Sequence, residues 1–383
     1  MLNEIDEWER QAENYYVLQD EDDSIITYAG RRLVKGDQYL DKNNFLYEVV
    51  DLDDYIVHCK FIREVNLKEE GLRYEEATIV PAAQQGNFRE VIAIYHTHNA
   101  ESYVPTDGSD SIYGQGGIHQ VGSAMANALR EKGIEVVHAQ DLHLPHDRGA
   151  YRRSRVTVLR LLEENKPDAF FDVHRDAAPK EAYEAEIDNT DVAQVQFVVG
   201  RQNPNASVNR RLAYDLKNYS DEMYPGLVKG VFLTWGDFNQ DLSPLNLLLE
   251  VGAHTNSRES AENGAALFAD VVAFYFYGIA PGATIADRNA NPPSLRGEAR
   301  GVSIYEALAG IIGGLILGGI GFYFLNEPAR VKELEKNLYF YLGKNSPLRK
   351  NVSNNLFLWK EGLQDIGSKI LIFARRIKEG VRR

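Results

Sequence analysis

The chain has 383 residues, 44% of them hydrophobic and 26% charged, which is the composition of a folded protein large enough for two domains. Its formal net charge of −14 at pH 7 argues against nucleic-acid binding by the bulk of the protein. The single cysteine, Cys59, excludes a disulfide within the chain, and we assign it no function.

Short apolar runs separated by turn residues mark the first part of the chain. Residues 1–16 have the pattern of an amphipathic helix or a disordered lead. They show neither the basic start nor the apolar run of a signal peptide, so we expect a targeting segment upstream of Met1. The following runs predict a small β-rich module that completes a first region, 1–66, and residues 67–88 predict a linker. The module's predicted strands cover residues 15–18, 25–28, 45–50 and 55–61.

From residue 89 to residue 280, strand-like and helix-like segments alternate. This alternation predicts an α/β domain with a mostly parallel or mixed sheet that is flanked by helices on both faces. The predicted strands cover residues 91–95, 134–138, 169–173, 194–199 and 245–251, and the predicted helices cover residues 119–132, 151–165, 205–224 and 259–278.

The C-terminal part has the pattern of a membrane anchor. After a Pro/Gly/Asn-rich linker, 281–305, the uncharged run LAGIIGGLILGGIGFYFL predicts a single transmembrane helix over residues 306–326. The tail, 327–383, is basic and amphipathic, and could lie on an anionic membrane surface or remain solvated. Its positive charge predicts a cytoplasmic tail and places the acidic remainder of this membrane protein outside the cytoplasm.

The stretch VIAIYHTHNAES carries the first candidate ligands. His96 and His98 would point to one face if the strand before them stays extended, and Glu101 follows three residues after His98. Imidazole and carboxylate ligands of this kind bind zinc. The alternative is a polar loop whose histidines are satisfied by hydrogen bonds.

Two other apolar strands end in residues of the same kind. His174 follows the strand at 169–173, and Glu250 lies inside the strand at 245–251. A carboxylate there needs a partner, a raised pKa or a position at the mouth of the strand. Its structural alternative is a buried ion pair with an arginine.

Together these residues form the set used for metal-dependent amide hydrolysis. The candidate zinc ligands are His96, His98, Glu101 and His174, with Glu250 as the general base that activates water and returns the proton to the leaving amine. If only three protein ligands are used, spacing favours His98, Glu101 and His174. His96 would then support the site or bind substrate, although the two histidines could exchange roles.

Other residues near these motifs have less specific signals. Arg175 could bind substrate or stabilise an oxyanion, or it could pair with Asp172 or Asp176. His119 lies near a helix start and could line the site, whereas loop histidines are more often solvated than metal-binding. The histidines that we expect to be solvated are His138, His143 and His146.

Four motifs, in order, resemble the stage II sporulation protein P family of endospore-forming bacteria. They are YHTHNAESYVPTD (Tyr95–Asp107), DVHRD (Asp172–Asp176), YPGLVKGVF (Tyr224–Phe232) and FNQDLSPLNLLLEVG (Phe238–Gly252). The β-rich segment 24–62 also resembles a module that precedes the catalytic domain in some members. The resemblance implies a fold similar to zinc-dependent N-acetylmuramoyl-L-alanine amidases for residues 89–280. The family's functional residues carry over to His96 or His98, Glu101, His174 and Glu250.

The resemblance also implies an activity and partners. A member would hydrolyse peptidoglycan during engulfment, cutting the amide between N-acetylmuramic acid and the stem peptide, with stage II sporulation proteins D and M as partners. The family usually has an N-terminal anchor, whereas this chain has its apolar run near the C-terminus. The alternatives are a zinc endopeptidase or carboxypeptidase on murein peptides and a non-catalytic, glycan-binding membrane scaffold.

Overall fold

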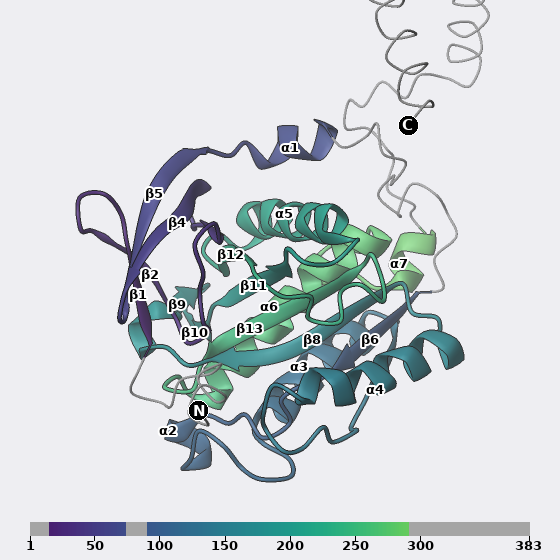
Figure 1. Cartoon of the computed structure of the whole chain (residues 1–383). Coiled ribbons are helices and arrows are strands. Elements are labelled where there is room, and N and C mark those ends of the chain that lie inside the picture. Colours follow the sequence, from purple (N-terminus) through teal and green to yellow (C-terminus); the bar gives the residue numbers. More distant parts are fainter. Residues whose placement is uncertain (1–14, 74–89, 291–383) are drawn as a thin grey trace, which may run out of the picture. The chain divides into compact units, whose positions relative to one another are not determined.

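A mixed eleven-stranded sheet organises residues 15–73 and 90–290, which are the residues that the computed structural model describes. The strand order is β2-β1-β5-β4-β3-β12-β11-β13-β8-β6-β7. Figure 1 shows the purple strands of the N-terminal module at the left of the sheet and the blue strand β6 toward the right. The predicted α/β class with a mixed sheet is confirmed. No helix in this part of the chain is long and apolar enough to cross a bilayer, and the predicted span, 306–326, lies outside it, as does the tail.

The central strands are apolar runs buried on both faces, as expected for a sheet covered by helices. The strands β7, β6, β8 and β13 pair in parallel, β11 runs antiparallel to β13, and β12 runs parallel to β11. Their bounds are β6 Val91–Tyr95, β7 Glu135–His138, β8 Ala169–Asp176, β11 Val195–Gly200, β12 Val228–Thr234 and β13 Asn246–Ala253. The strand β8 runs three residues past its predicted end, so that His174 lies within it, and Glu250 lies within β13 as predicted.

The strand β12 was not predicted, because Lys229 and Gly230 interrupt its apolar run. It nevertheless joins the N-terminal module to the rest of the sheet, since β3 pairs with it antiparallel. A Cβ atom at Gly230 would lie 2.5 Å from the carbonyl oxygen of Leu40, so glycine permits the close approach of β3. The module strands are β1 Tyr16–Gln19, β2 Ile25–Ala29, β3 Gln38–Leu40, β4 Phe45–Asp53 and β5 Ile56–Glu64.

Two apolar layers enclose the sheet. On one face the helices α3 (Ile118–Glu131), α5 (Ala206–Met223) and α6 (Arg258–Tyr277) form the largest core with Ile92, Ile94 and Phe171. On the other face α4 (Ala150–Glu164) packs on Ala93 and Phe170. The module covers the rest of that second face, where its buried residues contact the sheet at Val198, Phe232 and Leu248.

Short elements occupy segments that we expected to be linkers. Residues 67–73 form α1 (Leu67–Arg73), whose Leu67 is buried in the main core and whose Lys68 pairs with Glu222 of α5 at 2.7 Å. The predicted linker at 67–88 therefore begins as a packed helix. The linker predicted at 281–305 likewise begins with α7 (Ile285–Ala290). The remaining short elements are α2 Val104–Asp107, a 3-10 turn at Lys180–Ala182, and the hairpin β9 Glu184–Ile187 and β10 Thr190–Ala193.

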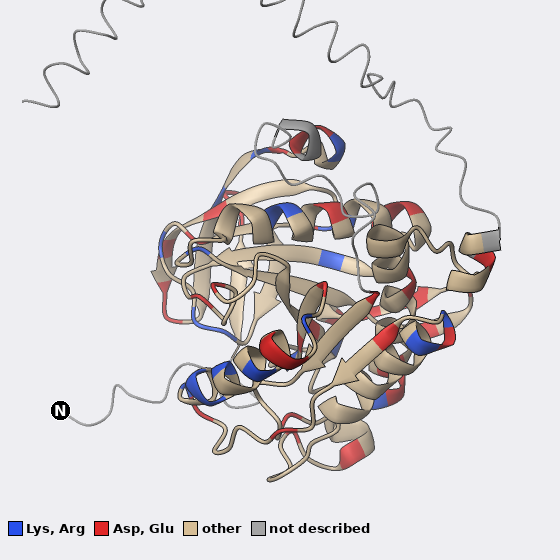
Figure 2. Cartoon of the chain, turned by 90° about the vertical axis from the view of Figure 1, so that its right-hand side faces the viewer, with Lys and Arg blue, Asp and Glu red and all other residues tan. Residues whose placement is uncertain are grey.

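Charged residues are concentrated outside the centre of the sheet. Figure 2 shows most acidic and basic residues on helices and loops, with the central strands largely uncharged. Burying a charged group is costly unless it is paired or hydrogen-bonded. The charged residues within β8 and β13 are therefore exceptions that need a structural or functional explanation: Asp172, Arg175 and Asp176 on β8 and Glu250 on β13.

Candidate functional site

The end of β6 directs its two histidines into different surroundings. The strand stops at Tyr95, and the chain bends at Thr97 and His98, so the extended geometry does not persist. The ring of His96 lies 4.5 Å from that of His119 on α3. The ring of His98 lies 5.0 Å from that of His174 on β8. His96 and His98 therefore join two separate groups, and only His98 faces the remaining predicted ligands.

The first group consists of His98, Glu101 and His174, all buried. The Oε1 atom of Glu101 lies 3.3 Å from Nδ1 of His98 and 3.2 Å from Nδ1 of His174. One ligand atom from each residue lies within 4.8 Å of the others. Two imidazole nitrogens and one carboxylate oxygen at this spacing fit a zinc ion with a fourth position left for water.

A hydrogen bond and an ionic contact hold two members of this group in place. The backbone N–H of Arg175 donates to Oε2 of Glu101 at 3.0 Å. On the far side of the His174 ring, Nε2 lies 3.0 Å from Oδ1 of Asp172, whose carboxylate also accepts from the backbone N–H and the hydroxyl of Thr97. An imidazole that faces a metal with one nitrogen and a carboxylate with the other has its orientation and tautomer fixed.

The electrostatics of the group favour an ionised Glu101. Burial opposes the charge, but His174 and the other cationic or hydrogen-bonding neighbours hold the pKa of Glu101 well below its usual range. Burial also opposes protonation of His174, yet the carboxylates of Asp172 and Glu101 raise the pKa of His174 well above its ordinary value. The cluster thus attracts positive charge, either a proton or a cation.

Glu250 lies beside this group, because it is the register partner of His174 in the neighbouring strand. Its Oε1 pairs with Nη2 of Arg31 at 2.6 Å, while Oε2 accepts no hydrogen bond from any residue in the described part of the chain. Burial raises the pKa of Glu250 to about 7, against the lowering effect of Arg31. A carboxyl group that titrates near neutral pH can both accept and return a proton.

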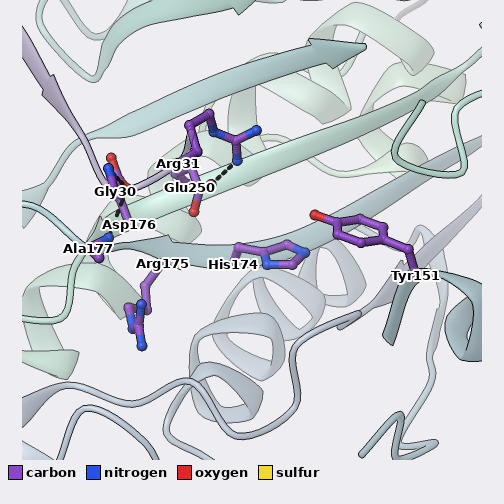
Figure 3. A pocket seen from close by; sticks show the side chains of 8 residues that line it. All are labelled: Gly30, Arg31, Tyr151, His174, Arg175, Asp176, Ala177 and Glu250. Atoms are coloured by element: carbon purple, nitrogen blue, oxygen red, sulfur yellow. Dashed lines mark hydrogen bonds and ion pairs between the residues drawn. The ribbon is translucent and has the colours of Figure 1, made fainter. Parts of the chain in front are cut away.

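A small pocket opens onto these side chains. Figure 3 shows Arg31 reaching onto Glu250, with His174 pointing toward Tyr151 on the opposite side. The Tyr151 and His174 rings are stacked, with centroids 6.3 Å apart. The pocket is lined by Gly30, Arg31, Tyr151, His174, Arg175, Asp176, Ala177 and Glu250.

Arg175 lines the pocket but directs its guanidinium away from Glu250, as Figure 3 shows. Its Nη2 donates to the backbone oxygen of Asp110 at 3.0 Å. The contact of Arg175 with the candidate ligands is instead made by its backbone N–H, which holds Glu101. In this geometry Arg175 is better placed to position a ligand than to stabilise an oxyanion.

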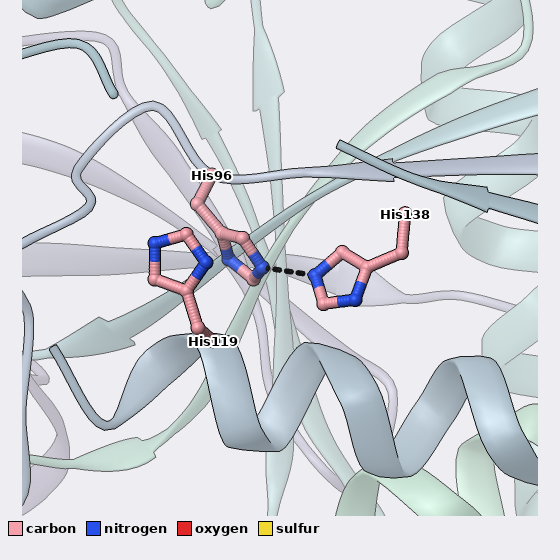
Figure 4. A group of neighbouring side chains, drawn as sticks. All are labelled: His96, His119 and His138. Atoms are coloured by element: carbon pink, nitrogen blue, oxygen red, sulfur yellow. Dashed lines mark hydrogen bonds between the residues drawn. The ribbon is translucent and has the colours of Figure 1, made fainter. Parts of the chain in front are cut away.

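The second histidine group consists of His96, His119 and His138 (Figure 4). His119 therefore lies near His96 rather than lining the pocket, and His138 is half-buried rather than solvated. His143 is also buried and bonds the carbonyl oxygen of His96 and the hydroxyl of Thr157. The ring of His146 lies 4.3 Å from that of His98. The prediction that these histidines are solvated is therefore wrong for His143, which is buried under hydrogen bonds to the end of β6, whereas His138 and His146 are partly buried.

Arg31 is the site residue that sequence reasoning missed. A buried arginine partner was the structural alternative considered for Glu250, but nothing in the sequence indicated which arginine would fill that position. The side chain comes from the loop after β2, where the N–H of Gly30 donates to Oδ1 of Asp176 at 2.9 Å. Only the pairing of the module with the sheet brings it there.

Comparison with known proteins identifies the relatives of this chain. A family model described as Stage II sporulation protein P (SpoIIP) matches residues 38–273. The chain is 33% identical over 230 residues to Stage II sporulation protein P of Bacillus subtilis (strain 168), in a match that covers 55% of this chain and 57% of that protein. The match therefore spans little more than half the length of this curated relative.

Among solved structures, three amidases give matches of low TM-score. The CwlD amidase from Clostridioides difficile, in complex with the GerS lipoprotein, is 12% identical with a TM-score of 0.33, covering 48% of this chain and 97% of that chain. AmiC2 of Nostoc punctiforme is 16% identical with a TM-score of 0.30, covering 49% and 98%. Ami1 from Mycobacterium smegmatis is 13% identical with a TM-score of 0.31, covering 50% and 96%. These TM-scores are too low to establish a common fold.

Proposed function

The chain belongs to the stage II sporulation protein P family, and from this premise we propose that it is a zinc-dependent peptidoglycan hydrolase. The bond that it cuts is the amide between N-acetylmuramic acid and the stem peptide, during engulfment. The observation that carries the proposal is the placement of Glu250 beside His98, Glu101 and His174. A general base next to a His₂Glu donor set is the arrangement that metal-dependent amide hydrolysis requires.

The residues have distinct roles in this mechanism. His98, Glu101 and His174 would hold the zinc ion, which when bound supplies a lowered pKa for water and polarisation of the scissile carbonyl. Glu250 accepts the proton of the attacking water and then returns it to the leaving amine. The Arg31 ion pair keeps the Glu250 carboxylate in place between these two proton transfers. Asp172 orients His174, and the Arg175 backbone N–H orients Glu101.

The location of the enzyme is part of the proposal. The apolar run at 306–326 would tether it to the cell membrane, with the basic tail, 327–383, in the cytoplasm and the hydrolase outside. This location gives residues 89–280 access to peptidoglycan. Stage II sporulation proteins D and M would be its partners there.

The test is product analysis on purified sacculi. Full-length protein in detergent is incubated with sacculi, with and without a chelator, and the released material is identified by mass spectrometry. An amidase releases free stem peptides and leaves glycan strands without peptides. Release of shortened peptides that remain attached to muramic acid would instead indicate an endopeptidase or carboxypeptidase.

Variants separate catalysis from binding. We expect Glu250→Gln to lower turnover at least roughly 100-fold with zinc content unchanged, because general acid–base catalysis typically contributes this much. The control is Glu131→Gln, an exposed carboxylate at the end of α3, which should leave turnover unchanged. Full activity of Glu250→Gln would refute the assigned mechanism. Zinc-loaded wild-type protein that binds sacculi but releases nothing would indicate a scaffold.

A further inference from the structure

The group formed by His96, His119 and His138 lies apart from the pocket, against α3. Its rings come from the end of β6, the first turn of α3 and the end of β7, and Figure 4 shows them converging above that helix. The ring centroids of His96 lie 4.5 Å from those of His119 and 5.1 Å from those of His138. One ring nitrogen from each lies within 4.8 Å of the others. We propose that these three histidines bind a second divalent transition-metal ion, independently of the first group.

The hydrogen bonds of two rings leave the converging nitrogens as acceptors. Nδ1 of His96 lies 2.8 Å from the carbonyl oxygen of Val173, which can only accept, so Nδ1 carries the proton and Nε2 the lone pair. Nδ1 of His119 lies 3.0 Å from Oε1 of Gln140, which leaves Nε2 of His119 with a lone pair by the same reasoning. Metal-binding histidines in proteins are fixed in this way, by a hydrogen bond from the other ring nitrogen.

His138 completes the group with one proton shift. Its Nε2 lies 2.8 Å from Nε2 of His96, and because the latter is an acceptor, His138 is the donor in the metal-free arrangement. Binding a metal through His138 Nε2 moves that proton to Nδ1 of the same ring, with no net proton release. The amide nitrogen of Asn99, which lies 3.2 Å from Nε2 of His119, loses this contact but keeps its hydrogen bond to the carbonyl oxygen of Asp141.

Gly122 supplies the space for the converging rings. A Cβ atom at this position of α3 would lie 2.6 Å from both Cε1 and Nε2 of His96, and 2.9 Å from Nε2 of His138. Distances under 3 Å are not tolerated between non-bonded carbon and ring atoms, so any other residue would push these nitrogens apart. Helix α3 therefore carries no side chain at the point where the ligand nitrogens meet.

The donor set indicates the class of metal. Three imidazoles without a carboxylate suit zinc, copper, nickel or cobalt, whereas magnesium and calcium require oxygen ligands. Tetrahedral zinc at its usual bond lengths places ligand nitrogens about 3.4 Å apart. The 2.8 Å pair must therefore open slightly, which rotation of the rings can provide. Such an ion would cross-link the ends of β6 and β7 to α3. This function would be structural and distinct from hydrolysis.

Metal stoichiometry tests the proposal directly. Full-length protein in detergent is stripped with a chelator and titrated with Co²⁺, whose visible absorption reports tetrahedral nitrogen ligation. We expect two equivalents for wild type, one for His174→Ala, one for His138→Ala and none for the double variant. His58→Ala, a histidine of β5 outside both groups, should keep two equivalents. Loss of all metal from His174→Ala, or two equivalents in His138→Ala, would overturn the second site.

A further variant and measurement guard against misfolding of the histidine variants. Gly122→Ala keeps all three histidines, and its gain in helix propensity partly offsets the overlap of the new Cβ with His96, so we expect it to lose one equivalent of Co²⁺ and to remain folded. Ser123→Ala on the same helix is the matched control. X-ray absorption of zinc-loaded His98→Ala/His174→Ala protein should show three imidazoles and one oxygen ligand, the water that completes the tetrahedron. A shell made mainly of oxygen ligands, or two equivalents in Gly122→Ala, would refute the site, while the product analysis on sacculi would stand unaffected.

Discussion

Arg31 and Glu250 lie 219 residues apart in the chain, yet their side chains form a buried ion pair of 2.6 Å. The arginine belongs to the N-terminal module and the glutamate to the strand beside the candidate zinc ligands. The guanidinium of Arg31 also lies over the ring of Phe238, with its carbon 5.3 Å from the ring centroid. The module therefore contributes a side chain to the candidate active site.

Replacing this arginine should impair proton transfer. In Arg31→Met the buried Glu250 carboxylate loses its partner, so its pKa rises above about 7 and less of it is ionised at neutral pH. We expect kcat/KM at pH 7 to fall roughly 10- to 100-fold, and the acidic limb of the pH–rate profile to move to higher pH. Arg32→Met, an exposed neighbour, is the control. Increased activity of Arg31→Met would mean that the ion pair restrains the enzyme.

Gly30 should be intolerant of any side chain, because it lies against the end of β8. A Cβ atom there would lie 2.6 Å from Cβ of Ala177 and 2.8 Å from its backbone nitrogen and oxygen. We expect Gly30→Ala to displace the loop that carries Arg31 and to lower activity at least about 10-fold with metal content unchanged. Because both changes act through Arg31, the double variant Gly30→Ala/Arg31→Met should be no less active than Arg31→Met alone. Additive losses would contradict this coupling.

Asp172 should influence metal affinity without touching the metal. Its carboxylate accepts two hydrogen bonds from Thr97 and lies 3.0 Å from Nε2 of His174. Asp172→Asn replaces one acceptor oxygen with a donor, and changing such a partner typically costs about 10- to 100-fold in metal affinity. Competition with a zinc indicator measures the loss, and Asp191→Asn, an exposed residue of β10, is the control. Unchanged affinity would exclude the positioning role.

Lys229 should make stability depend on pH. Its ammonium lies 3.9 Å from the ring centroid of Tyr183, and burial lowers the pKa of Lys229 to about 7. Between that value and the ordinary value of 10.5, the unfolded chain binds a proton that the folded chain does not, so stability increases as pH rises. The slope is at most about 1.4 kcal/mol per pH unit above pH 7.

Comparing variants isolates this contribution. We expect Lys229→Met to be more stable than wild type at pH 7, with the difference shrinking toward pH 10, as measured by urea unfolding. Lys60→Met, on the exposed side of β5, should show no such trend. A difference that stays constant with pH would show that Lys229 remains charged in the folded protein.

Hydrophobic periodicity predicts most of the α/β region, because its strands are apolar runs and its helices have one apolar face. The exceptions have local causes. The sequence pattern of β12 is not recognisable as a strand, because Gly230 and Lys229 interrupt its apolar run. Glycine is required at 230 by the close contact with β3, and Lys229 has a buried amino group. The strand β8 continues through three polar residues because each finds a partner inside the fold. Such partners are long-range, and no local pattern encodes them.

In the candidate site too, local spacing predicts some features and long-range packing determines the others. Spacing alone favours His98, Glu101 and His174, and the structure brings these three together. The separation of His96 from His98 depends on where β6 ends, and element boundaries are the least reliable part of a sequence-based prediction. The three-histidine group against α3 forms only when a loop, a helix and a strand pack together, so the spacing of its residues in the sequence does not predict it.

The pairing of β3 with β12 has a consequence for any shortened form of this protein. A chain that began at residue 89 would keep every candidate zinc ligand, but it would leave β12 as a bare sheet edge. Its backbone N–H and C=O groups, now paired with Gln38–Leu40, would face solvent beside Val231 and Leu233. Exposed apolar edges of this kind promote intermolecular strand pairing. The module therefore also acts as a cap that keeps the sheet from associating with other copies of itself.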